Sequence, residues 1–298
     1  MIGTGHVPVL LEEALKQLDI GRAGTYIDGT LGMGGHSLEI LRRNPKASVI
    51  GFDRDEASLR KAGERLAEFG ARVRLYHGDF KEIPGLGLDL GKVRGVLLDL
   101  GMSSFQLDSP ERGFSFNADG PLDMRMDLRT KATAASVLEK YSEAKLDEVF
   151  RTYGELPHTR RLAREIVSRR KLHPFETTGQ LRRLVEEIYR WRPQKGKVHP
   201  AAKAFQALRI EINGELEGLG AFLESMVSGT RPGTRFVVIA FHSLEDRIVK
   251  RTFAALASPA EGAPRLRILT KKPLTASESE VAANTRSRSA KLRSAEKV

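Results

Sequence analysis

Four glycines crowd the stretch DGTLGMGGHS, residues 28–37, between a short apolar run and an amphipathic segment. Glycine costs backbone entropy, so such a cluster indicates that the backbone turns sharply or passes very close to something. A helix that begins after this turn would present unpaired N–H groups, which suit a polar or anionic ligand. The stretch therefore predicts a ligand-binding turn between a strand and a helix.

The spacing of these glycines bears on which ligand the turn binds. Gly32 and Gly34 almost make the dinucleotide pattern G-x-G-x-x-G, but Ser37 stands where the third glycine should be. This disfavours an NAD-binding oxidoreductase. The pattern Asp28-x-x-x-Gly32-x-Gly34 fits better with the first loop of S-adenosylmethionine-dependent methyltransferases, because that cofactor has no pyrophosphate.

Two more candidate residues follow the next two apolar runs. Asp53, in GFDRD, can accept hydrogen bonds from both hydroxyls of a ribose, since a carboxylate has two acceptor oxygens. Its alternative role is to cap the following helix, which Asp55 can do as well. Phe80, in HGDF, either flanks an adenine ring or belongs to the core. Three such features at the carboxyl ends of successive strands predict one crevice for a nucleoside cofactor.

Asp99 ends a further buried run, GVLLDL. A carboxylate in that position is costly unless it is paired, so it needs a partner such as adenine N6 or a substrate amine. The chain has no cysteine, which excludes disulfides, thiolate zinc sites and cysteine nucleophiles. Methylation at C5 of a pyrimidine usually uses such a nucleophile, so the composition favours methylation of an amine.

The elements that must position these residues alternate between strand and helix over the first hundred residues. Short connections between them predict a parallel sheet with helices on both faces. The expected helices of this part are 35–43, 56–70 and 215–227. The expected strands are 24–30, 47–55, 71–80, 91–104, 232–243, 265–269 and 290–296.

From about residue 126 the apolar residues recur at helical spacing with no strand between them. Leu181, Leu184, Val185 and Ile188 make a clear stripe at i, i+3, i+4 and i+7, with Thr177 or Thr178 as N-cap. The chain is therefore expected to be one α/β domain with a helical insertion. Its expected parts are residues 1–125, 126–213 and 214–298, and the polar stretch 275–289 is expected to be a loop.

The net charge of +11 is concentrated in one segment. Residues 151–210 contain fifteen Lys and Arg against five Glu, whereas the other residues are nearly balanced. A basic region of this kind is typical of a polyanion-binding surface, and its alternative is a set of solvated helix faces. No signal peptide or membrane span is evident, so a cytoplasmic protein is expected.

Five motifs together resemble the bacterial 16S rRNA (cytosine-N4)-methyltransferase family. They are HVPVLLEEAL, DGTLGMGGHS, LLDLGMSSFQLDSPERGFSFNADGPLDMRMD, HPAAKAFQALRIEIN and FHSLEDRIVK, and they run in order from His6 towards the last strand. The resemblance implies a class I Rossmann-like fold with a helical insertion after the fourth strand. It also implies methyl transfer from S-adenosylmethionine to the exocyclic amine of a cytidine in the decoding region of small-subunit rRNA.

The same resemblance assigns the cofactor contacts. It implies Gly34, Gly35 and His36 in the turn, Asp53 at the ribose and Phe80 against adenine, followed by Asp99 and Gln106. Because the insertion adds residues that the cofactor does not need, the expected substrate is 16S rRNA within an assembled or nearly assembled 30S subunit.

The chain departs from the Asp/Asn-Pro-Pro-aromatic motif that many amine methyltransferases have after the fourth strand. The residue that accepts the N4 proton is therefore left open between Asp99 and Ser103. In the following loop, Arg112, Phe114 and Phe116 are candidates to stack on or grip a flipped base.

Two further motifs concern a metal and a helix start. Asp123 and Asp127 lie in the same loop as these aromatics, but no His or third carboxylate is spaced to complete a metal site, so no metal is expected. Ser243 and Asp246 have the spacing of a capping box. That box leaves His242 unexplained, and His242 is a candidate to face the substrate.

The alternative functions that remain for the protein are a methyltransferase for another RNA amine and a non-catalytic RNA-binding assembly factor.

Overall fold

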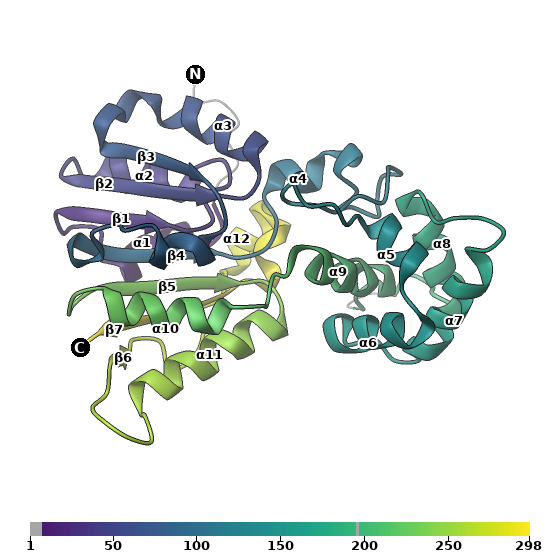
Figure 1. Ribbon diagram of the computed structural model, residues 1–298. Coiled ribbons are helices and arrows are strands. Elements are labelled where there is room, and N and C mark those ends of the chain that lie inside the picture. The colour runs from purple at the N-terminus through teal and green to yellow at the C-terminus, as the bar shows by residue number, and fades with distance from the viewer. Residues whose placement is uncertain (1–7, 195–196) are drawn as a thin grey trace. The chain divides into compact units, whose positions relative to one another are not determined.

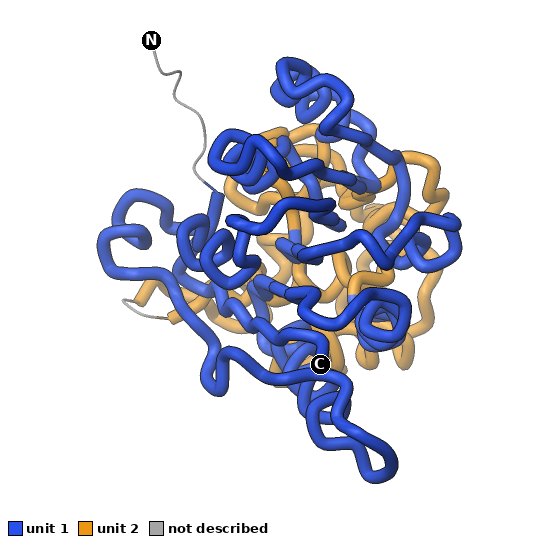
Figure 2. Tube along the Cα trace, turned by 90° about the vertical axis from the view of Figure 1, so that its left-hand side faces the viewer, with its two compact units in different colours: residues 1–101, 216–298 blue, residues 102–215 orange. Residues whose placement is uncertain are grey.

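The computed structural model describes residues 8–194 and 197–298, and the chain forms two compact units (Figure 2). The sheet unit comprises the residues up to Gly101 and those from Leu216 on. The helical unit comprises Met102–Glu215. Among the described residues, no helix is long and apolar enough to cross a lipid bilayer.

The sheet unit contains a seven-stranded sheet with the order β3-β2-β1-β4-β5-β7-β6 in the described part of the chain (Figure 1). Strands β1 to β5 pair in parallel, and β7 is antiparallel to both β5 and β6. This topology is the Rossmann-like methyltransferase fold, as expected. The strands are β1 Gly24–Asp28, β2 Ala47–Asp53, β3 Val73–His77, β4 Val93–Asp99, β5 Arg235–Ala240, β6 Leu266–Ile268 and β7 Lys291–Lys297.

Helices cover both faces of this sheet because alternate strand residues point to opposite sides. Tyr26 packs in the cluster beneath α1 Leu11–Leu18, α2 Gly35–Arg43 and α3 Glu56–Leu66. Its neighbour Ile27 packs in the opposite cluster. The helices that bury that second cluster are α10 Leu219–Gly229 and α11 Ser243–Ala257.

The polar stretch 275–289, expected to be a loop, contains the short helix α12 Glu278–Ala283. The Ser277 hydroxyl caps this helix by accepting the N–H of Glu280. The Glu280 carboxylate in turn accepts the N–H of Leu10 at 2.8 Å. Local polar bonds and this distant contact hold the helix, and neither leaves an apolar stripe in the sequence.

The helical unit lies in the chain between β4 and α10, so the insertion follows the fourth strand as expected. Its own core is formed by apolar side chains of α5 to α9 together with Phe114, Leu122 and Met124. Its helices are α4 Ser104–Asp108, α5 Ala134–Lys140, α6 Glu143–Gly154, α7 Thr159–Arg169, α8 Thr178–Tyr189 and α9 Pro200–Asn213.

The start of this unit differs from the expected boundary at residue 126. The unit begins at Met102, because the loop after β4 packs its apolar side chains into the helical core. The expected end at residue 213 is two residues from the observed one at Glu215. Thr177 is the N-cap of α8, its hydroxyl accepting the N–H of Gln180.

Candidate active site

Three carboxylates lie at the same edge of the sheet unit. Asp28, Asp53 and Asp99 are the last residues of β1, β2 and β4, which are parallel neighbours. In an open α/β sheet this carboxyl edge is where ligands bind. The glycine turn after β1 and Asp53 at the end of β2, two of the three features expected to share a crevice, therefore lie at one edge of the sheet, and Asp99 at the end of β4 lies there as well.

The glycine turn between β1 and α2 is shaped first by the packing of the protein itself. Gly34 is the N-cap of α2 with φ 75°, and a Cβ there would lie 3.2 Å from Leu66. At Gly35 a Cβ would lie only 2.5 Å from the side chain of Pro8. Both glycines are thus required by close approach of neighbouring side chains, in addition to any role towards a ligand.

Asp53 is held by backbone donors and keeps part of its acceptor capacity. Its two oxygens accept the N–H of Gly32 at 2.7 Å and of Asp55 at 2.8 Å. Asp55 caps α3, its side chain accepting the N–H of Ala57, so the capping role is not that of Asp53. A carboxylate has about four lone-pair sites, which leaves room for two more donors.

Burial raises the pKa of two of the three carboxyl groups to about 6. For Asp53, the backbone bonds from Asp55 and Gly32 oppose the effect of burial. For Asp28, the hydrogen bond from the Ser37 hydroxyl, at 2.7 Å, opposes it in the same way. The two groups therefore titrate near pH 6, above the usual range of an aspartate.

Asp99 is the least satisfied of the three. Its backbone N–H donates to the Thr30 hydroxyl at 2.5 Å, but its side-chain Oδ1 is buried and has no hydrogen-bond partner in the described part of the chain. Burial raises its pKa well above the usual value, and the charges of Asp28 and Glu245 add to this. A buried carboxylate oxygen without a donor is costly, so this atom calls for an N–H or O–H from a ligand.

His36 lies next to this carboxylate. Its Nε2 is 3.1 Å from the carbonyl oxygen of Val9, and its Nδ1 is 3.7 Å from Asp99 Oδ2. Because a carbonyl oxygen only accepts, Nε2 carries the hydrogen in the neutral ring and Nδ1 is left as an acceptor. The ring of His36 therefore lies beside Asp99, with Nδ1 beyond hydrogen-bond distance of its carboxylate.

Phe80 is mostly a core residue. It is 7% exposed, and its ring packs edge-on against Phe222 with the centroids 4.8 Å apart. The residue before it, Asp79, caps the 3₁₀ turn Phe80–Gly85. This packing accounts for Phe80 without a ligand. Only the small exposed part of its ring is available for contact with an adenine.

Ser103 and Gln106 form a capping box at the start of α4. The Ser103 hydroxyl accepts the N–H of Gln106 at 3.2 Å, and the Gln106 side chain accepts the N–H of Ser103 at 3.0 Å. Gln106 is 3% exposed. Helix capping therefore explains both residue types.

Comparison with known proteins decides the family. The family model for the MraW methylase family matches residues 3–298. The chain belongs to the MraW methylase family. It is 48% identical to ribosomal RNA small subunit methyltransferase H of Carboxydothermus hydrogenoformans over 98% of each chain. It is 46% identical to the protein of that name from Oleidesulfovibrio alaskensis, over 99% of this chain and 96% of the relative.

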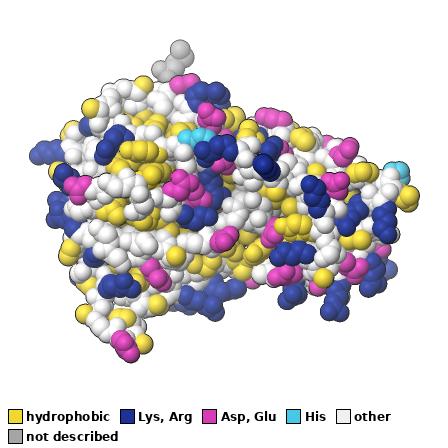
Figure 3. Space-filling model, in the orientation of Figure 1, with side chains coloured by type: hydrophobic (Ala, Val, Ile, Leu, Met, Phe, Trp, Pro, Cys, Tyr) yellow, Lys and Arg dark blue, Asp and Glu magenta, His cyan; other side chains and the backbone are white. Residues whose placement is uncertain are grey.

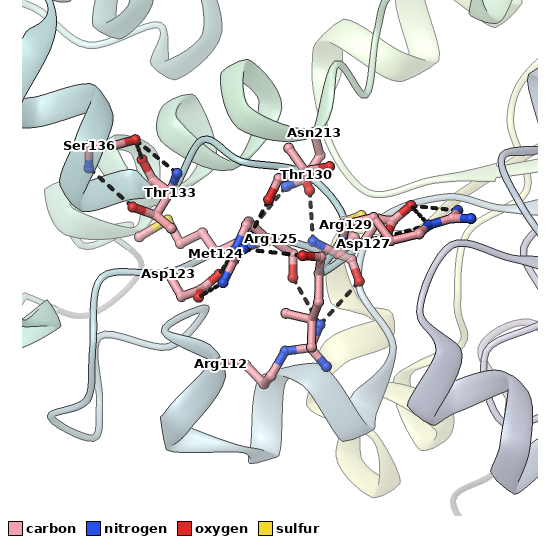
Figure 4. A network of polar contacts seen from close by, with 12 residues as sticks. Arg112, Asp123, Met124, Arg125, Asp127, Arg129, Thr130, Thr133, Ser136 and Asn213 are labelled. Atoms are coloured by element: carbon pink, nitrogen blue, oxygen red, sulfur yellow. Dashed lines mark hydrogen bonds and ion pairs between the residues drawn. The ribbon is translucent and has the colours of Figure 1, made fainter.

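In this methylase, the hydrogen bonds and ion pairs shown in Figure 4 hold the loop after α4 in its conformation. Arg112 donates to two backbone carbonyls farther along the loop, at 2.9 and 3.1 Å. Phe114 is 5% exposed and belongs to the helical core. The expectation that these two residues grip a substrate base is therefore wrong. Phe116, half-buried, stacks on His199 with the ring centroids 5.0 Å apart.

The start of α11 in the methylase also differs from the expected capping box. The N-cap is His242, whose Nδ1 accepts the N–H of Glu245 at 3.4 Å, and Glu245 accepts the N–H of His242 at 3.3 Å. Asp246, expected to close a box with Ser243, instead pairs with Arg293 at 2.6 Å. Capping therefore explains Nδ1 of His242, whereas its Nε2 is buried without a hydrogen-bond partner among the described residues.

Glu245 contributes to the site in a way that the sequence did not indicate. It is 2% exposed, and its charge is one of those that raise the pKa of Asp99. A Glu three residues after an N-cap residue is the usual sign of a capping box. The sign is hard to recognise here because the N-cap residue is a histidine, which is unusual in that position.

Proposed function

We propose that this methylase uses S-adenosylmethionine to methylate the exocyclic N4 amine of a cytidine in the decoding region of 16S rRNA. Family membership and the naming of its relatives as ribosomal RNA small subunit methyltransferase H support the reaction class and the substrate. The observation that most directly supports an amine as the methylated group is the Oδ1 of Asp99, which is buried and has no hydrogen-bond partner among the described residues. An enzyme with this substrate would act in the cytoplasm.

The residues at the sheet edge fit the cofactor. Asp53 retains acceptor sites for the two ribose hydroxyls, and the turn at Gly34, Gly35 and His36 opens at the start of α2. The exposed edge of Phe80 can flank the adenine, whereas the unpaired Oδ1 of Asp99 can accept a hydrogen bond from adenine N6 or from the substrate amine, but not from both. Gln106 belongs to this set only by resemblance, since capping already accounts for it. When bound, S-adenosylmethionine supplies an activated methyl group on its sulfonium.

Asp99 is the better candidate to accept the N4 proton. Cytosine N4 is a poor nucleophile because its lone pair is delocalised into the ring, so a hydrogen bond accepted from N4–H assists attack. A methylated N4 would keep one proton fewer than the free amine, so a residue of the enzyme would have to accept the proton that N4 loses. The raised pKa of Asp99 suits it to take that proton. The Ser103 hydroxyl is a much weaker base and is already engaged in capping.

We propose that no metal is required. Asp123 and Asp127, the carboxylates of the loop after α4, are each paired with an arginine two residues on, Arg125 and Arg129, at 2.7 Å. Paired carboxylates of this kind are poor ligands for a hard cation, since the guanidinium already neutralises them.

The proposed reaction can be tested on rRNA from cells. Mass spectrometry of 16S rRNA from a strain lacking the gene should show the loss of one N4-methylated cytidine, and the wild-type gene should restore it. Loss of a methyl group from a different RNA amine would overturn the assignment of the target. No loss of any methyl group would favour the non-catalytic assembly factor.

Replacing Asp53 by Ala should weaken cofactor binding by about 1–3 kcal/mol, because two ribose hydroxyls lose their acceptor. Calorimetric titration with S-adenosylhomocysteine measures this directly. The control is Asp89→Ala, since Asp89 is exposed and pairs only with Lys92 in the described part of the chain. Wild-type affinity in the Asp53→Ala protein would contradict the ribose contact.

Cofactor affinity should also depend on pH through Asp53. Its pKa of about 6 in the unbound protein means that the carboxylate must lose a proton before it can accept both hydroxyls. Below pH 6 the protonated form prevails, so the Kd should rise about tenfold between pH 7 and pH 5. Titrations across this range should show the rise in the wild type and not in Asp53→Asn. A flat profile in the wild type would contradict the assignment.

A further inference from the structure

The helical unit contains a pocket of about 830 Å³ that the methyl-transfer site does not use. It is lined by side chains of α6, by the start of α7 and by the end of α8. The charged residues of its wall are five arginines, one histidine and one carboxylate: Arg151, Arg160, Arg161, Arg164, Arg190, His158 and Asp147. Figure 3 shows Lys and Arg side chains gathered over this end of the helical unit.

The arginines of this pocket are largely unneutralised. Arg151, Arg161 and Arg190 are exposed and have no carboxylate within ion-pair distance among the described residues. Arg160 lies 3.8 Å from Asp147, a loose contact for a side chain that is 86% exposed. The Asp147 carboxylate is itself bonded to the Thr159 hydroxyl at 2.5 Å.

Other arginines of the basic segment are committed to holding the unit together. Arg169 pairs with Glu187 at 2.6 Å and with Glu165 at 3.1 Å. Arg170 donates to the carbonyl oxygens of Leu138 and Tyr141 at 2.6 and 2.7 Å. Lys171 and Arg183 of the same segment are exposed as well, but they do not line the pocket, which is where five arginines of this unit converge.

The backbone around the pocket is also unusual. His158 and Arg190 both have left-handed backbone conformations, with φ of 55° and 47°, which residues other than glycine rarely adopt. His158 is the N-cap of α7 and makes no side-chain capping bond. The first turn of an eleven-residue helix therefore faces the same pocket as the arginines, and its N–H groups favour negative charge.

We propose that this pocket binds the phosphodiester backbone of the substrate RNA, a proposal that rests on the proposed function. Guanidinium groups match phosphate oxygens in pairs, and several of them converge here with a helix N-terminus. A volume of about 830 Å³ exceeds the needs of a single small anion. It suits a strand that runs through the pocket with successive phosphates. The pocket anchors the RNA through contacts that the methyl-transfer site does not make.

The test compares two variants that change the charge equally. Arg151→Glu with Arg161→Glu reverses two unpaired arginines of the pocket. Lys171→Glu with Arg183→Glu reverses two exposed cations of the same unit that do not line it. Binding to 16S rRNA and to 30S subunits is measured by filter retention across a salt series, and S-adenosylhomocysteine binding is measured alongside.

The pocket variant should bind RNA about tenfold or more weakly at 0.15 M salt, with a salt slope smaller by roughly two units. Its affinity for S-adenosylhomocysteine should equal that of the wild type, and the control variant should lose much less RNA affinity. Equal losses in the two variants, or wild-type binding by the pocket variant, would overturn the proposal. If the wild type binds rRNA through the pocket and methylates none of it, the proposed function is wrong, but the proposal that the pocket binds RNA is retained.

Discussion

Replacing Asp99 by Asn should lower kcat by about 10²- to 10⁴-fold, the usual contribution of a positioned proton acceptor. The substitution keeps the shape of the side chain and removes its basicity. Because Oδ1 is buried without a partner among the described residues, it can accept a hydrogen bond from the amine of the proposed substrate. Single-turnover assays on saturating rRNA measure the loss, and Asp89→Asn is the matched control on the surface.

The pH profile gives a second measure of the same role. A general base must be ionised, so kcat falls as the pH drops through its pKa. Burial raises that pKa, which moves the fall to a higher pH than an ordinary carboxyl group would give. This limb of the profile should be absent from Asp99→Asn. If the variant instead kept its kcat and lost cofactor affinity, Asp99 would be a partner of adenine N6 rather than the base.

The strands and the edge of the sheet could be predicted because their signals are local. Buried apolar runs that end in Asp28, Asp53 and Asp99 predict both the parallel strands and the common edge of their carboxyl ends. The start of α2 at Gly35 is equally local, since a glycine turn precedes it.

The chemistry of the edge was only partly predictable. The sequence places Asp99 at a strand end, but only the structure shows that Oδ1 lacks a donor and that His36 lies beside it. The contribution of Glu245 to the pKa of Asp99 requires the fold, because the two residues are far apart in the chain.

Elements that depend on distant contacts were missed for the same reason. Phe114 follows a polar loop and looks available to a base, yet it packs into the core formed by helices that come later in the chain. The extent of the helical unit, from Met102 rather than residue 126, follows from that packing. His242 was not recognised as an N-cap because its ring nitrogen replaces the usual hydroxyl or carboxylate.

The substrate should be methylated far more efficiently within a small ribosomal subunit than in a short hairpin that carries the same cytidine. A base inside folded RNA must be unstacked before its amine can reach Asp99, which costs a few kcal/mol. Contacts remote from the reacting amine must offset that cost, and the unneutralised pocket of the helical unit offers them. A hairpin too short to span both places forgoes about 3 kcal/mol, or roughly 100-fold in kcat/KM.

Assays with tritiated S-adenosylmethionine on the two substrates, run side by side, measure this difference. The pocket variant Arg151→Glu with Arg161→Glu adds an internal control. It should act on the hairpin like the wild type and lose most of its advantage on the subunit, since only the larger substrate reaches the pocket. Equal rates of the wild type on hairpin and subunit would mean that the helical unit does not recognise a large substrate. A variant that lost the same factor on both substrates would place the defect at the reacting centre, because remote contacts cannot affect a substrate that never makes them.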